Sequence, residues 1–122
     1  MDAQQQLLRG KTAAITGGLT GIGRAIALGF LRHGCHVGIN YLGGPSDETL
    51  LEQLKSELPQ NGTQFVSVAG DISNPETGKL LVQEVVDRWG TLDIFVSNAG
   101  ICQFAELLEY LVTPFLWMVT GC

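Results

Sequence analysis

The stretch KTAAITGGLTGIG at residues 11–23 decides the fold of this 122-residue chain. Its first six residues are β-prone and predict a strand, and the glycines after them predict a turn. Helical spacing of apolar residues then begins at Gly21 and continues to His33. A strand, a glycine turn and a helix in this order present bare backbone at the positive end of the helix dipole, where a phosphate group binds well.

Three glycines in this turn have distinct predicted roles. Gly17 makes the tight turn, Gly21 allows a pyrophosphate to approach the backbone, and Gly23 allows the helix to pack tightly on the strand. The residues between them complete the expected cofactor contacts: Leu19, Thr20 and Ile22. A turn that needs glycine only to reverse the chain is the alternative, but the position between a strand and a helix favours dinucleotide binding.

The rest of the chain continues the alternation of strands and helices. Further strands are predicted at 36–41, 64–69 and 92–97, and further helices at 47–58 and 74–89. The last helix has a strong start, because Asn74 can cap it and Pro75 fits its first turn. The order βαβαβαβ predicts the α/β class, as a single Rossmann-type domain over residues 1–122 with a doubly wound parallel sheet.

The end of the strand at 36–41 bears on the choice of cofactor. About 20 residues beyond the glycines, an acidic side chain would hydrogen-bond the ribose of NAD and repel the 2′-phosphate of NADP. Asn40 and Tyr41 stand at this position, so the chain has no carboxylate there and no Arg or Lys nearby. We therefore expect NADP, or the use of both NADP and NAD. Tyr41 has an alternative interpretation as an aromatic residue that packs at the strand end.

The composition excludes several classes of function. The formal net charge is −5 and no run of Lys or Arg is present, so no nucleic-acid partner is expected. No apolar stretch is long enough to span a membrane, and residues 1–10 lack the apolar segment of a signal peptide. We expect a cytoplasmic protein that contacts neither membranes nor nucleic acids.

The cysteine and histidine residues predict neither a metal site nor a disulfide. Three widely spaced cysteines are typical of reduced thiols in a cytosolic protein: Cys35, Cys102 and Cys122. A metal site at His33, Cys35 and His36 is the alternative. These residues flank Gly34 at a helix-to-strand turn and have no second ligand cluster, so no metal is expected.

The glycine turn resembles that of the short-chain dehydrogenase/reductase family. The family pattern Thr-Gly-x-x-x-Gly-x-Gly is matched by Thr16, Gly17, Gly21 and Gly23. The resemblance implies an NAD(P)-dependent oxidoreductase that moves a hydride between nicotinamide and a hydroxyl or carbonyl carbon of a small polar substrate. It also implies a homo-oligomer, as is usual in the family.

Two further motifs continue the resemblance in the same order along the chain. One is similar to the family aspartate that contacts adenine, and the other to the family motif Asn-Ala-Gly. The cofactor contacts that these motifs imply are Asp71, Ile72, Asn98, Ala99 and Gly100. Ser97 departs from the family, which usually has another asparagine there. Without the family context, the alternative interpretations are a turn or cap carboxylate for Asp71 and a turn former for Asn98.

The catalytic residues of the family are not found in this chain. The family uses a serine and a Tyr-x-x-x-Lys pair after Asn-Ala-Gly, whereas Tyr110 has Pro114 at the lysine position. No catalytic residue is therefore predicted. The sheet is expected to be truncated after the fourth strand, with an atypical apolar tail at 106–122. An open fourth strand would make the chain marginally stable and prone to self-association.

Residues 95–109 (FVSNAGICQFAELLE) resemble the sugar dehydrogenases of fungal type within this family, which implies an aldose substrate. Two alternatives to an oxidoreductase remain open. The chain could be a non-catalytic fragment that binds a dinucleotide or pairs with a full-length subunit. It could also be a product without function.

Overall fold

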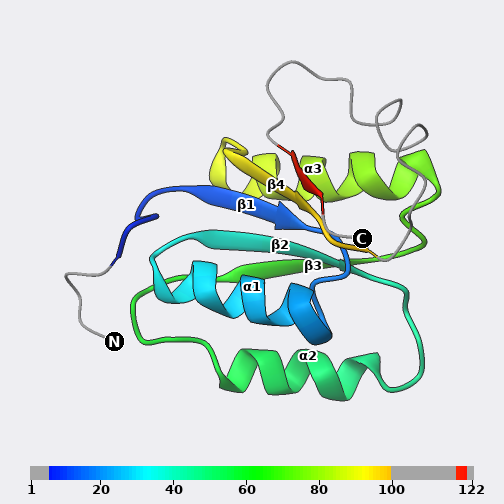
Figure 1. Cartoon of the computed structure of the whole chain (residues 1–122), viewed down its shortest axis with the longest axis horizontal. Coiled ribbons are helices and arrows are strands. Elements are labelled where there is room, and N and C mark those ends of the chain that lie inside the picture. Colours follow the sequence, from blue (N-terminus) through cyan, green and yellow to red (C-terminus); the bar gives the residue numbers. More distant parts are fainter. Residues whose placement is uncertain (1–5, 100–117, 121–122) are drawn as a thin grey trace.

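The computed structural model describes residues 6–99 and 118–120. Within these residues, the centre is a five-stranded parallel sheet in the order β3-β2-β1-β4-β5 (Figure 1). The strands are β1 (Thr12–Ile15), β2 (His36–Tyr41), β3 (Phe65–Ala69), β4 (Ile94–Ser97) and β5 (Met118–Thr120). The helices are α1 (Gly21–Arg32), α2 (Asp47–Ser56) and α3 (Pro75–Trp89).

The fold confirms the predicted α/β class of Rossmann type. The ends of β1 to β4 and of α1 to α3 lie within two residues of the predicted ends. The helix α3 also begins as predicted, because Asn74 Oδ1 accepts a hydrogen bond from the N–H of Glu76 at 3.1 Å and Pro75 occupies the first turn. Local capping and periodicity were therefore sufficient to predict these elements.

The prediction that the fourth strand is an open edge is wrong. The strand β5 pairs with β4 in parallel, with Phe95 opposite Met118 and Ser97 opposite Thr120. A continuous apolar run such as 111–119 does not itself show whether it forms a strand or what it pairs with. In the described residues, the two edge strands are β3 and β5. The rest of the tail at 106–122 lies outside the described residues.

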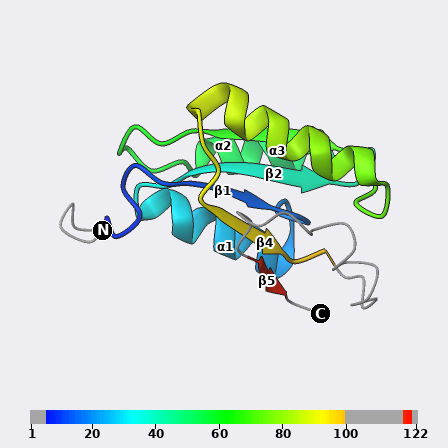
Figure 2. The ribbon, with the colours of Figure 1, turned by 90° about the horizontal axis from the view of Figure 1, so that it is seen from above.

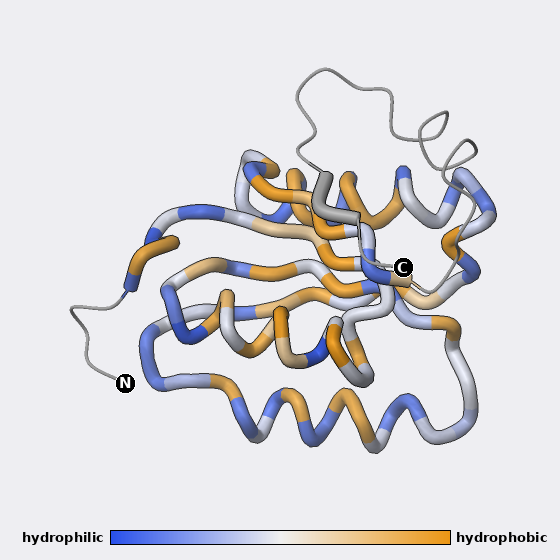
Figure 3. Tube along the Cα trace, viewed as in Figure 1, coloured by the Kyte–Doolittle hydropathy of each residue, from blue (hydrophilic) through white to orange (hydrophobic). Residues whose placement is uncertain are grey.

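Helices cover both faces of the sheet, as Figures 1 and 2 show. One buried cluster joins α1 and α2 to the sheet, and includes Leu28, Leu31, Leu54, Val37 and Ile39. A second joins α3 to the opposite face, and includes Leu81, Val85, Ala14 and Phe95. Along α2, hydrophobic and hydrophilic segments alternate as expected of a helix with one buried face (Figure 3). No helix in the described part of the chain is long and apolar enough to cross a membrane.

The parallel strands bring the loops after β1, β2, β3 and β4 to one edge of the sheet, their carboxyl edge. Because β2 lies on one side of β1 and β4 on the other, the strand order reverses between β1 and β4. In sheets of this kind, ligands bind outside the carboxyl ends of the strands at that point. We therefore expect a ligand to bind at the glycine turn after β1 and at the segment after β4.

Candidate functional site

The turn after β1 has the backbone conformation that the sequence predicts. Gly17 and Gly21 have φ angles of +63° and +56°, in the left-handed region where residues with a side chain are disfavoured. A Cβ atom added to Gly21 would have no atom of the described residues within 4 Å. The turn therefore requires glycine at this position for its conformation, and it leaves open space beside the backbone.

The packing of α1 against the turn depends on Gly23. A Cβ atom there would overlap the carbonyl oxygen of Gly17 and lie 2.5 Å from Nδ2 of Asn98. Gly23 thus allows tight packing of the helix, but on the glycine turn and on the segment after β4, whereas packing on the strand was predicted. Gly18 is a second packing position, which the motif spacing did not reveal, because a Cβ there would lie 2.7 Å from Cγ2 of Ile39 on β2.

Thr16 fixes the turn to the segment after β4. This residue is buried, and its Oγ1 accepts hydrogen bonds from the N–H of Asn98 at 2.9 Å and of Ala99 at 3.1 Å. In return, Nδ2 of Asn98 donates to the carbonyl oxygen of Gly17 at 3.2 Å. The structure therefore brings three predicted residues together, Gly17, Asn98 and Ala99, whereas Gly100 lies outside the described residues.

The N-terminus of α1 has no side-chain cap. Thr20 is the residue at the cap position, and its side chain makes no capping hydrogen bond to the helix. The helix α3 differs, because the side chain of Asn74 caps it. The first turn of α1 also contains no acidic residue. Among residues 6–99, no side chain therefore caps its first N–H groups, which can bind an anion such as a pyrophosphate.

Asn40 lies inside the protein and not on the surface of the carboxyl edge of the sheet. It is 3% exposed, and its Nδ2 donates to the carbonyl oxygens of Gly70 at 2.9 Å and Val68 at 3.4 Å. Its Oδ1 accepts a hydrogen bond from the N–H of Gly17 at 3.4 Å. Both ends of the amide are thus used to join the glycine turn to the end of β3. We expect Asn40 to stabilise the conformation of this edge of the sheet. A contact between Asn40 and the ribose stays a prediction.

The other predicted contacts differ in exposure. Tyr41 is half-buried and packs against the cluster beneath α1, in agreement with its alternative interpretation as a packing residue. Leu19 is buried in the same cluster, so only its backbone can face a cofactor. Thr20 is exposed, and the side chain of Ile22 is 74% exposed at the start of α1. Ile72 is half-buried in the turn after β3.

Asp71 lies in the same turn and is exposed. Its Oδ1 accepts hydrogen bonds from the N–H of Ser73 at 2.9 Å and from the Ser73 hydroxyl at 2.8 Å. These two bonds, the backbone bond first, lower the pKa of the Asp71 carboxyl from its ordinary value. The geometry is that of a turn carboxylate, and the contact with adenine stays a prediction.

Replacing Ser73 by alanine should raise the pKa of Asp71 part of the way toward its ordinary value, since the hydroxyl bond is lost and the N–H bond kept. Because the pKa is lowered in the folded state, the interaction stabilises the fold above the ordinary carboxyl pKa. This stabilisation is lost as the pH falls through the lowered value. NMR titration of the Asp71 carboxyl in both chains measures the change, and identical curves would show that the hydroxyl has no such effect.

The described residues contain no cluster of His, Cys, Asp and Glu side chains that could hold a metal ion. Cys35 is buried, and this burial raises the pKa of its thiol to about 12. His36 stacks on Trp89 with 4.9 Å between the ring centroids, and its Nδ1 accepts a hydrogen bond from the N–H of Gln64. These contacts account for Cys35 and His36 without a metal. The other two cysteines lie outside the described residues: Cys102 and Cys122.

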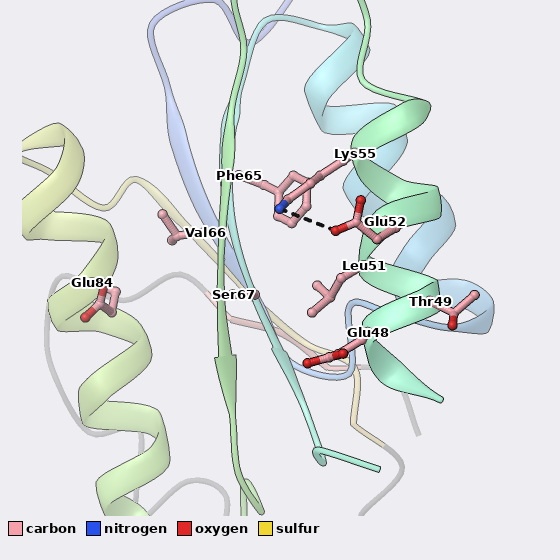
Figure 4. Close-up of a pocket in the computed structure, with 9 residues that line it drawn as sticks. All are labelled: Glu48, Thr49, Leu51, Glu52, Lys55, Phe65, Val66, Ser67 and Glu84. Carbon is pink, nitrogen blue, oxygen red and sulfur yellow. Dashed lines mark ion pairs between the residues drawn. The ribbon is translucent and has the colours of Figure 1, made fainter. Parts of the chain in front are cut away.

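A groove of about 780 Å³ lies beside the edge strand β3 (Figure 4). Its lining comes from α2, β3 and α3: Glu48, Thr49, Leu51, Glu52, Lys55, Phe65, Val66, Ser67 and Glu84. None of these residues belongs to the glycine turn or to the segment after β4. The lining contains three carboxylates and one cation, Lys55, which is paired with Glu52 at 3.9 Å. The groove is therefore poorly suited to an anionic dinucleotide, and the carboxyl edge is the better candidate site.

The sheet order and the glycine turn define a Rossmann-type fold of the dinucleotide-binding class. A family model described as short chain dehydrogenase matches residues 11–117. The chain therefore belongs to the short-chain dehydrogenase family, which confirms the resemblance drawn from the glycine turn and from the motifs at Asp71 and Asn98.

Several known proteins are similar to this chain. L-rhamnose-1-dehydrogenase of Scheffersomyces stipitis is 46% identical over 108 residues, which are 88% of this chain and 41% of that protein. L-rhamnose 1-dehydrogenase (NAD(P)(+)) of Sphingomonas sp. is 41% identical over 106 residues, 85% of this chain and 40% of that protein. The crystal structure of L-sorbose reductase from Gluconobacter frateurii, complexed with NADPH and L-sorbose, has a TM-score of 0.67 and 34% identity, and the match covers 80% of this chain and 36% of that one. The chain thus spans about two fifths of the length of these relatives.

Proposed function

We propose that this chain binds a nicotinamide dinucleotide at the carboxyl edge of its sheet. The observation that carries the proposal is the uncapped N-terminus of α1 directly after the left-handed glycine turn, which offers backbone N–H groups to a pyrophosphate. The open space beside Gly21 fits such a group. The other proposed contacts follow two further strands that end at the same edge: Asp71 and Ile72 after β3, and Asn98 and Ala99 after β4.

The cofactor we propose is NADP, with NAD also accepted. Asn40 and Tyr41 place no carboxylate at the end of β2 that would reject a 2′-phosphate. Relatives support either form, because the Sphingomonas enzyme carries NAD(P)(+) in its name and the L-sorbose reductase was solved with NADPH.

For the complete protein, the proposed reaction is hydride transfer to or from a hydroxyl or carbonyl carbon of a small polar substrate. When bound, the nicotinamide supplies the carbon that gives or accepts the hydride. An aldose substrate is supported by the names of the two rhamnose dehydrogenases. A single domain over residues 1–122, a homo-oligomeric assembly and a cytoplasmic location belong to the same proposal, and they rest on the sequence and the family.

A second candidate function is non-catalytic binding of the dinucleotide, or pairing with a full-length subunit. The absence of a Tyr-x-x-x-Lys pair from the 122 residues favours it for this chain taken alone. We therefore expect the chain to bind NADPH and NADH without oxidising or reducing them in the presence of a panel of aldoses. Turnover with any of these sugars would show that catalysis does not need the missing pair.

Gly21 offers a matched pair of variants that tests the proposed binding site. Gly21→Asp and Gly21→Asn share the strain of a left-handed residue, but only aspartate adds a negative charge beside the helix N-terminus. We expect NADPH to bind the aspartate variant about tenfold more weakly than the asparagine variant. Fluorescence titration of the nicotinamide measures both affinities. Equal affinities would show that the pyrophosphate does not bind at the N-terminus of this helix.

A further inference from the structure

We infer that Asp47 weakens the binding of a 2′-phosphate and so sets the balance between NADP and NAD. The inference rests on the proposed dinucleotide site and adds to it a residue that governs specificity. Asp47 is the first residue of α2, and its Oδ2 accepts hydrogen bonds from the N–H groups of Gly43 at 2.9 Å and Gly44 at 2.5 Å. The carboxylate is thereby held against the loop that leaves β2.

The position of this loop matches that of the ribose-binding segment of the fold. The loop directly follows Asn40 and Tyr41, the position at which an acidic side chain would contact the ribose of NAD. A Cβ atom on Gly43 would lie 3.4 Å from Cβ of Ala69, so the loop packs against the carboxyl end of β3. The Asp47 carboxylate therefore lies at the edge where the adenosine half of the cofactor is proposed to bind.

No positive charge balances this carboxylate within the loop. None of the seven Lys and Arg residues falls in residues 42–46. Arg24, near the start of α1, is paired with Glu57, and Lys55 on α2 lies 3.9 Å from Glu52. A 2′-phosphate entering the loop would meet the negative charge of Asp47 without a compensating cation from the loop.

The hydrogen bonds of Asp47 add a second effect to this repulsion. The N–H groups of Gly43 and Gly44 are the kind of backbone donors that bind phosphate oxygens, and the carboxylate already occupies both. A ribose hydroxyl, in contrast, can donate to a carboxylate. Asp47 therefore weakens the binding of NADP relative to NAD, and it reduces the preference for NADP that the absence of a carboxylate at Asn40 and Tyr41 would otherwise give.

The test compares the NADPH and NADH affinities of three chains by fluorescence titration at low ionic strength. The first is the unaltered chain, the second is Asp47→Asn, and the control is Glu48→Gln. Asparagine keeps an oxygen that can accept the two N–H bonds but removes the charge. The control removes the same charge from the next residue, whose side chain lines the groove beside β3 (Figure 4). Thermal melting followed by circular dichroism verifies that the variants fold.

We expect Asp47→Asn to raise the affinity for NADPH about tenfold relative to NADH, and Glu48→Gln to change the ratio less than about twofold. An unchanged ratio in Asp47→Asn, or an equal change in both variants, would overturn the inference while leaving the proposed function in place. Failure of all three folded chains to bind either dinucleotide would overturn the proposed function, and the inference with it.

Discussion

The Gly23→Ala chain is expected to be less stable than the unaltered chain by about 2–4 kcal/mol. The added methyl group would overlap the carbonyl oxygen of Gly17 and crowd Nδ2 of Asn98, and one of these atoms belongs to the backbone of the turn. Relief of the overlap must therefore move the turn or the helix. Because the displaced atoms form the proposed pyrophosphate site, NADPH binding should be lost together with the stability.

A control for Gly23→Ala lies on the same helix. Gly29 is in the interior of α1, and a Cβ atom there would meet no atom within 4 Å in the part of the chain that the structure describes. Gly29→Ala should therefore stabilise the chain by about 0.5–1 kcal/mol, as alanine does when it replaces glycine in an open helical position. Urea denaturation of both variants measures the two changes. If both variants were equally stable, the tight packing of α1 on the turn would not exist.

The Thr16→Val chain should lose about 1–3 kcal/mol of stability. Valine has nearly the shape of threonine but no acceptor, so the N–H groups of Asn98 and Ala99 would lose their shared partner. The segment after β4 would then keep the bond from Nδ2 of Asn98 to the carbonyl oxygen of Gly17 but lose both bonds to Thr16. We expect weaker dinucleotide binding and faster hydrogen exchange of the two amides.

Thr16→Ser removes the methyl group of this residue and keeps its hydroxyl, so it distinguishes the effects of the two groups. Serine keeps the oxygen and should retain the protection of the Asn98 and Ala99 amides, with a loss of about 1 kcal/mol for the missing methyl group. Hydrogen exchange followed by NMR distinguishes the two variants. Equal exchange rates in the valine and serine chains would mean that Oγ1 does not hold this segment.

The regular elements were predictable because each depends on its own stretch of sequence. The apolar spacing of α1 and the Asn74-Pro75 start of α3 are local signals, and the structure places both helices where these signals predict. The strand β5 depends instead on its pairing with β4, which no local pattern records. Because β5 was not predicted, the fourth strand, β4, was incorrectly predicted to be an open edge.

The candidate site was predictable only in part, for a similar reason. Glycine spacing predicted the turn and the packing at Gly23, since these are properties of consecutive residues. The role of Asn40 depends on the carbonyl of Gly70, which lies 30 positions away in the chain, so spacing alone suggested a ribose contact. Spacing did not indicate Asp47, because this residue lies on α2, beyond the end of β2, and its carboxylate reaches Gly43 and Gly44 only by turning back toward them.

The most direct test of the central claim is to add NADH to the isotopically labelled 122-residue chain and to map the backbone amides whose NMR signals move. The claim predicts shifts in three segments of the carboxyl edge: Gly17–Gly23, the turn at Asp71, and Asn98 with Ala99. Residues of the groove beside β3, such as Glu52 and Ser67, should remain unaffected. Shifts confined to that groove, or no shifts at millimolar NADH, would contradict the account.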